Sequence, residues 1–119
     1  MEEFKNRQGA AARMNMALGA LHQVASVAIV AVIVFGDIAN AADGVKRLVA
    51  FVAVITSVTS WIFTSNALVA FQNDSKDMTD SEKATALGST EVKQPWMVYQ
   101  IYVFAITVAT IAIVLTSIY

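Results

Sequence analysis

The chain has 119 residues, of which 57% are hydrophobic and only 14% charged, and its formal net charge is −1. Soluble domains are about 45–50% apolar and about 25% charged, so this composition argues against a soluble domain. The near-neutral charge argues against a nucleic-acid partner. The lack of cysteine excludes disulfides and thiolate metal sites. We expect residues 1–119 to form a single integral membrane domain, with the lipid bilayer as a partner.

Three stretches without a charged side chain divide the sequence: 14–36, 48–73 and 94–119, which contain 23, 26 and 26 residues. A helix needs about 20 residues to cross a hydrocarbon core ~30 Å thick, so each stretch is long enough. The sequence therefore predicts an all-α integral membrane bundle of three transmembrane helices with a short polar N-terminal head at 1–13. The expected spans are about 16–36, 47–71 and 96–118.

The first span resembles a secretory signal sequence in one respect. It follows a basic head and is followed by Ala39–Ala41, an A-x-A-like pattern. The apolar stretch is longer than the roughly 7–15 residues of a signal-sequence core, so we expect a retained membrane span. The short loop at 37–46 makes the first and second helices antiparallel neighbours.

Small and hydroxyl-bearing residues recur at helical spacing in all three spans, which predicts close contacts between helices. In the second span they are Ala53, Thr56, Ser57, Ser60 and Thr64. In the third span they are Ala105, Ala109, Ala112 and Thr116. The first span offers Ala17, Leu21, Val24, Ala28 and Ala31. The alternative is that the hydroxyl stripe of the second span lines a pore in a ring of identical chains.

The long polar loop before the third span predicts one short surface helix near 80–87. Thr79 and Glu82 have the spacing of a capping box, and Gly88 is a candidate C-terminal cap. Pro95 then begins the third helix, where its missing N–H costs nothing. Aromatic side chains at both ends of this span predict interfacial anchors: Trp96, Tyr99, Tyr102 and Tyr119.

Basic residues predict the orientation in the membrane. Six of them, Lys5, Arg7, Arg13, Lys76, Lys83 and Lys93, fall on the side of the N-terminus and the 72–95 loop, and only Lys46 and Arg47 fall on the other side. Because basic residues accumulate on the cytoplasmic side, we expect the N-terminus and the 72–95 loop there and the C-terminus on the opposite side.

His22 is the only histidine, and it lies about two turns inside the first span on the same helix face as Asn15 and Ser26. A neutral imidazole there predicts a hydrogen bond to a neighbouring helix or a lipid head group. The alternatives are a ligand for haem, chlorophyll or a metal, and a pH-sensitive switch. No other histidine or carboxylate lies within the spans, so we expect no metal and no resident cofactor.

Residues 13–33, RMNMALGALHQVASVAIVAVI, are similar to the first helix of heliorhodopsins. The similarity covers about 20 of the 119 residues. That family has seven spans and a lysine that binds retinal, whereas this chain has three predicted spans with no lysine inside them. We infer no function from the similarity.

No pattern in the sequence predicts an enzyme, because no Gly-rich phosphate loop, HExxH or GxSxG motif occurs. Pumps and ion pathways usually place ionisable groups inside spans, and here no Asp, Glu, Lys or Arg does so. We expect a non-catalytic structural or accessory subunit within a larger membrane assembly, such as a bioenergetic or secretion complex or a virion membrane. Its partners would be other membrane subunits or copies of itself. The alternative is a small homo-oligomeric channel or transporter.

Overall fold

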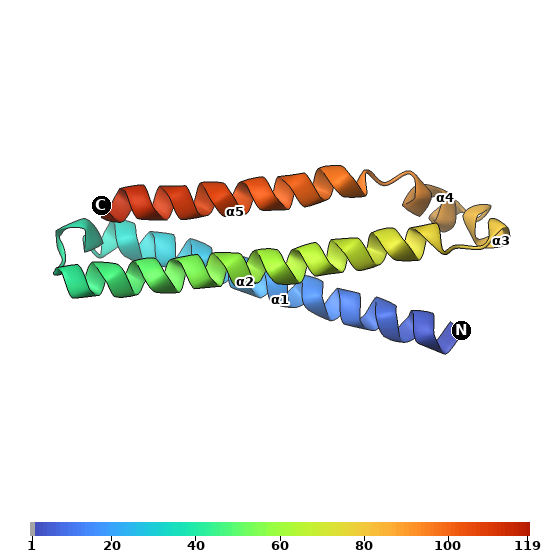
Figure 1. Ribbon diagram of the computed structural model, residues 1–119, viewed down its shortest axis with the longest axis horizontal. Helices are drawn as coiled ribbons and strands as arrows, with labels where there is room; N and C mark the ends of the chain where they lie inside the picture. The colour runs from blue at the N-terminus through green and yellow to red at the C-terminus, as the bar shows by residue number, and fades with distance from the viewer. Residues whose placement is uncertain (1) are drawn as a thin grey trace.

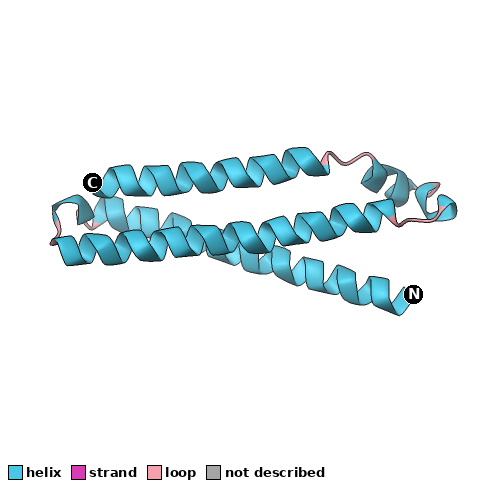
Figure 2. Cartoon of the chain, viewed as in Figure 1, coloured by secondary structure: helices cyan, strands magenta, loops and turns pink. Residues whose placement is uncertain are grey.

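The structure, a computed structural model, describes residues 2–119 without the side chains of residues 2, 4, 5 and 8. The described chain is helical throughout, with short connections and no strand (Figure 2). Its elements are α1 (Glu2–Phe35), the 3-10 turn η1 (Ile38–Asn40), α2 (Asp43–Lys76), α3 (Asp80–Lys83), α4 (Ala86–Val92) and α5 (Trp96–Ile118). The predicted all-α class is confirmed.

Three of these helices, α1, α2 and α5, are long and apolar enough to cross a membrane. Only 17%, 22% and 17% of their most apolar segments are buried inside the chain. Most of their apolar surface is therefore left for lipid or for another membrane protein, which fits a multi-pass membrane protein. The molecule is 61 Å long and only 24 × 16 Å across.

The long helices run alternately up and down the bundle (Figure 1). The N-terminus lies at the end that carries α3 and α4, and the C-terminus lies at the end that carries η1 (Figure 1). The N-terminal half of α1 diverges from α2, whereas α5 follows α2 along its length (Figure 1). The two ends of the chain thus lie at opposite ends of the bundle (Figure 1), and the side of a membrane on which each lies stays a prediction.

The predicted polar head at 1–13 is not a separate element, because α1 begins at Glu2 and continues without a break. Residues 2–13 contain no proline, and Arg7 forms an ion pair with Glu3 one helical turn away, a pairing that supports an exposed helix. At 34 residues, α1 is about 51 Å long at 1.5 Å per residue. Its first turns therefore extend beyond a ~30 Å hydrocarbon core.

The chain reverses direction between α1 and α2 through a tight turn at Asp37. Asp37 has φ 53 and ψ 41, in the left-handed region, which aspartate tolerates better than most residues because its side chain can bond locally. Here its carboxylate accepts a hydrogen bond of 2.9 Å from the side-chain nitrogen of Asn40. This turn places α2 antiparallel to α1, which confirms the predicted neighbour relation.

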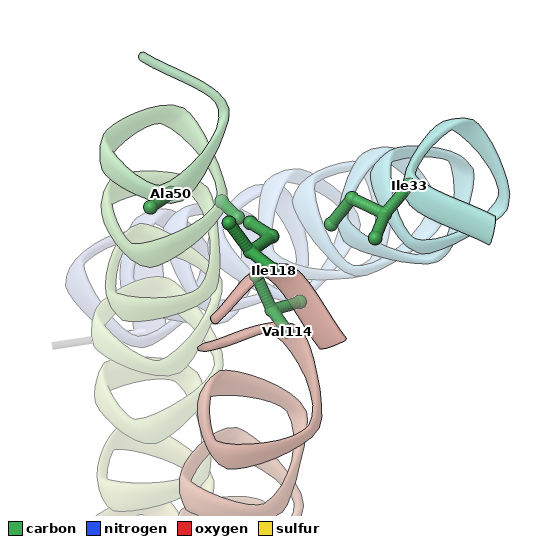
Figure 3. Close-up of a cluster of buried hydrophobic side chains, with 5 residues drawn as sticks. Ile33, Ala50, Val114 and Ile118 are labelled. Atoms are coloured by element: carbon green, nitrogen blue, oxygen red, sulfur yellow. The ribbon is translucent and has the colours of Figure 1, made fainter. Parts of the chain in front are cut away.

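A small apolar cluster holds the three long helices together at this end of the bundle. Figure 3 shows Ile33 of α1 and Ala50 of α2 on either side of Val114 and Ile118 of α5. Val114 and Ile118 are each 2% exposed, so their side chains fill the space between α1 and α2. Farther along, α5 packs against α2 through an edge-to-face pair of Trp61 and Phe104 with ring centroids 5.8 Å apart.

The loop between α2 and α5 contains two short helices where the sequence predicts one. The capping box is confirmed, because Thr79 accepts a hydrogen bond from the Glu82 backbone and the Glu82 carboxylate accepts one from the Thr79 backbone. The prediction that Gly88 caps the C-terminal end of a helix is wrong, because Gly88 lies inside α4 and is buried. Thr85 interrupts the helix, since its hydroxyl accepts a new capping bond of 3.0 Å from the Gly88 nitrogen.

Candidate functional site

The most specific polar arrangement within the spans joins α1 to α2. We call Gly19, Ser26, Ser57 and Ser60 the mid-span contact. The hydroxyl of Ser60 donates a hydrogen bond of 2.8 Å to the backbone oxygen of Gly19. Ser26, Ser57 and Ser60 are only 1%, 2% and 5% exposed. Polar groups this deeply buried in an apolar bundle are stable only when they are paired.

Gly19 allows the two helix backbones to approach closely. A Cβ atom at this position would lie 3.1 Å from the backbone nitrogen of Thr64 and 3.2 Å from the backbone oxygen of Ser60. It would also overlap the Thr64 hydroxyl. Glycine therefore permits both the close approach and the hydrogen bond from Ser60, as small residues do in membrane helix pairs.

A second pair of hydroxyls, Ser26 and Ser57, extends the contact by two turns along α1. Ser26 donates to the backbone oxygen of His22 at 3.0 Å, and the Ser26 and Ser57 hydroxyl oxygens are 3.4 Å apart. Because one hydroxyl has only one proton, Ser57 is the donor to Ser26 when Ser26 bonds His22. This order satisfies both hydroxyls without any charged group.

His22 lies at the middle of the first span, Gly9–Phe35, beside the mid-span contact. Its Nδ1 is 2.7 Å from the backbone oxygen of Leu18 in the same helix, and its ring centroid is 5.7 Å from that of Phe63 in α2. Among the described residues, no hydrogen bond joins the ring to a neighbouring helix, and the predicted bond to a neighbouring helix or a lipid head group stays a prediction. In the neutral ring, Nδ1 carries the proton and Nε2 is an acceptor.

A small cavity of about 200 Å³ lies on the other side of the mid-span contact, between α1, α2 and α5. The amide of Gln23 and the hydroxyls of Ser60, Thr64 and Thr107 are its polar groups. The Ser60 and Thr107 hydroxyls donate to the backbone oxygens of Gly19 and Val103. The remaining lining is apolar, so the cavity suits an acyl segment or an apolar side chain better than an ion.

The small residues predicted for packing fall into two groups. Ala53, Ser57 and Ser60 are buried, and Thr56 and Thr64 are half-buried. The small residues of α5 are all exposed and lie opposite the face that meets α2: Ala105, Ala109, Ala112 and Thr116. The residues suggested for the first span are exposed as well: Ala17, Leu21, Val24, Ala28 and Ala31. Neither of these two faces is buried within the chain.

The actual contact face of α1 has a spacing that sequence reasoning missed. Among the side chains of α1 that the structure describes, the buried residues are Ala12, Gly19, Ser26 and Ile33, which follow one another at intervals of seven. Those of α2 alternate by three and four from Ala50 to Ser60, which is the matching pattern for helices that wrap around each other. The seven-residue interval was readable in the sequence, but the runs of alanine on other faces obscured it.

The predicted interfacial anchors lie at the two ends of α5. Trp96 is half-buried, between Phe71 at 6.2 Å and Tyr99 at 5.9 Å between ring centroids. The Tyr99 hydroxyl donates a hydrogen bond of 2.6 Å to Gln94. Tyr102 and Tyr119 are exposed. Their placement in a bilayer stays a prediction.

The groups at the mid-span contact support helix association better than catalysis. Its hydroxyls bond backbone oxygens and one another, and none is bonded to a histidine ring or a carboxylate that would activate it as a nucleophile. Among the described residues, no three His, Asp or Glu side chains are grouped as metal ligands. Comparison with family models, with curated proteins and with solved structures gives no match.

Proposed function

We propose that the chain is a non-catalytic accessory subunit of a larger membrane assembly and that α5 binds a transmembrane helix of another subunit. The α5 docking face consists of Ala105, Ala109, Ala112 and Thr116. The observation that carries the proposal is that this face is made of small residues and is nevertheless exposed. Small residues are enriched where membrane helices meet, because they allow close approach, and they bring no comparable benefit against lipid.

The chain itself supplies a comparison for this face. The contact between α1 and α2 is built from the same kinds of residue, with Gly19, Ser57 and Ser60 at its centre. On α5, the larger side chains Val114 and Ile118 are already used against the other two helices. The opposite face is thus free for a second contact of the α1–α2 type.

The proposed orientation follows from the basic residues. Lys76, Lys83 and Lys93 lie at or near α3 and α4, at the same end of the bundle as the N-terminus (Figure 1). Lys46 and Arg47 lie at the start of α2, at the other end. The positive-inside rule then places the N-terminus and the 72–95 loop in the cytoplasm.

A pore lined by the hydroxyl stripe of α2 is less favourable. Ser57 and Ser60 are buried against α1, and their hydroxyls take part in hydrogen bonds there. Lining a pore with them would require α1 to separate from α2 and would leave the Gly19 and Ser26 contacts unmade. We therefore retain the accessory subunit as the proposal.

The proposal is tested by adding bulk to the α5 docking face. Ala109→Leu should weaken association with the partner by about 5- to 150-fold, because overpacking a close contact costs about 1–3 kcal/mol. The measurement is the native mass of the complex in a mild detergent, with helix content by circular dichroism to verify folding. Val108→Leu enlarges an exposed side chain on the flank of the same helix and should leave the complex intact. Equal masses for all three proteins would contradict the proposal.

A further inference from the structure

A second candidate binding site lies where the end of α2 meets the start of α5. It is a groove of about 550 Å³. Lys76 and Lys83 supply its charge, Gln72, Ser75 and Gln94 supply neutral polar groups, and no carboxylate lines it. Trp96 and Met97 form an apolar wall. The groove therefore has a positively charged part, at Lys76 and Lys83, and an apolar part, at Trp96 and Met97 of α5.

The positive groups in the groove have no partner within the described part of the chain. Lys76 and Lys83 are exposed, and their ammonium groups make no ion pair or hydrogen bond with other described residues. The start of α5 adds to the positive potential, since Pro95 provides no side-chain cap and the first turn contains no acidic residue. Uncapped N–H groups at the start of a helix carry partial positive charge and bind anions.

Trp96 contributes its apolar ring to the lining of the groove. Its indole Nε1 is buried and has no hydrogen-bond partner among the described residues. Buried donors are nearly always paired in folded proteins. Because this nitrogen has no surface open to the groove, it is not a contact for a ligand there.

We propose that this groove binds the phosphate of an anionic phospholipid. Lys76, Lys83 and the first turn of α5 hold the phosphate, and the acyl chains run down past Met97 along α5. The position suits a lipid better than a soluble phosphate, because Trp96 begins the charge-free span of α5 and phospholipid head groups lie at the ends of membrane spans. The proposal does not depend on a partner for the α5 docking face.

The test uses the fluorescence of Trp96 in a full-length chain carrying Trp61→Phe, so that Trp96 is the only tryptophan. The protein is reconstituted in vesicles of phosphatidylcholine and phosphatidylglycerol in which only the phosphatidylglycerol is brominated, so that its acyl chains quench the fluorescence. We expect more quenching than the mole fraction of phosphatidylglycerol accounts for. Combining Lys76→Gln with Lys83→Gln should weaken this preference about tenfold or more, since each basic residue near a membrane contributes several-fold to anionic-lipid binding.

Lys93→Gln is the matched control, because it removes one charge from the same loop at a residue that does not line the groove. It should change the preference by less than twofold. Quenching that matches the mole fraction, or a preference unchanged by the double substitution, would overturn the proposal. So would a change in Trp96 fluorescence on adding inorganic phosphate to pure phosphatidylcholine vesicles, because the site would then be one for soluble phosphate.

Discussion

Replacing Gly19 by alanine should destabilise the bundle although alanine is the better helix former. A Cβ at position 19 would lie 3.1 Å from the backbone nitrogen of Thr64 and 3.2 Å from the backbone oxygen of Ser60. Backbone atoms cannot rotate away as a side chain can, so α1 and α2 must separate by a few tenths of an ångström. Overpacking of this kind costs about 1–3 kcal/mol, and the gain in helix propensity offsets about 1 kcal/mol of it. The expected net loss in the free energy of unfolding is about 0–2 kcal/mol.

Gly9 supplies the matched control for Gly19→Ala. It lies in the same helix, and a Cβ there would meet nothing within 4 Å. Gly9→Ala therefore gains the same helix propensity without the clash, so the difference between the two variants isolates the packing term at about 1–3 kcal/mol. Reversible unfolding in mixed micelles, followed by circular dichroism, measures this difference. Equal stabilities of the two variants would refute the close approach of α1 to α2.

Three further predictions test other parts of the structure. Ser60→Leu should lower the free energy of unfolding by about 1–3 kcal/mol through overpacking, and an unchanged melting temperature would count against the contact. His22→Ala should lower the free energy of unfolding by about 0.5–1.5 kcal/mol through loss of the ring contact with Phe63, whereas His22→Phe should retain this contact. A visible absorption band of the purified protein that disappears in both variants would instead identify His22 as a cofactor ligand. Single cysteines in place of Gly44 and Ala84, in this cysteine-free chain, should react with an impermeant maleimide from opposite sides of sealed vesicles. Reaction of both from one side would contradict the three-span topology.

The spans could be predicted from the sequence because the membrane imposes a simple requirement on it. A helix in lipid must be apolar for about 20 residues, and the charge-free stretches meet this requirement directly. The third span agrees with α5 at both ends, Trp96 and Ile118, because Pro95 and the end of the apolar stretch define it. The first and second helices are longer than the predicted spans 16–36 and 47–71, since α1 already begins at Glu2 and α2 runs from Asp43 to Lys76.

The helix faces that make contact were harder to predict. In lipid, apolar residues are favourable on every side of a helix, so hydrophobicity does not indicate which face is buried. The stripe of Ser57 and Ser60 was predictable because hydroxyls need partners. Gly19, by contrast, carries no side chain, and its importance becomes visible only when Ser60 and Thr64 are seen beside it. The groove at Lys76 and Lys83 depends equally on how the loop folds back onto α5.

Photocrosslinking from the α5 docking face in the native membrane tests the accessory-subunit proposal most directly. A photoreactive diazirine side chain at Ala112 would report which molecules lie against this face, and the same group at Ile113, an exposed flanking residue, would provide the comparison. The proposal predicts adducts to a distinct polypeptide from position 112 and mainly to lipid from position 113. Lipid adducts alone from both positions would contradict it.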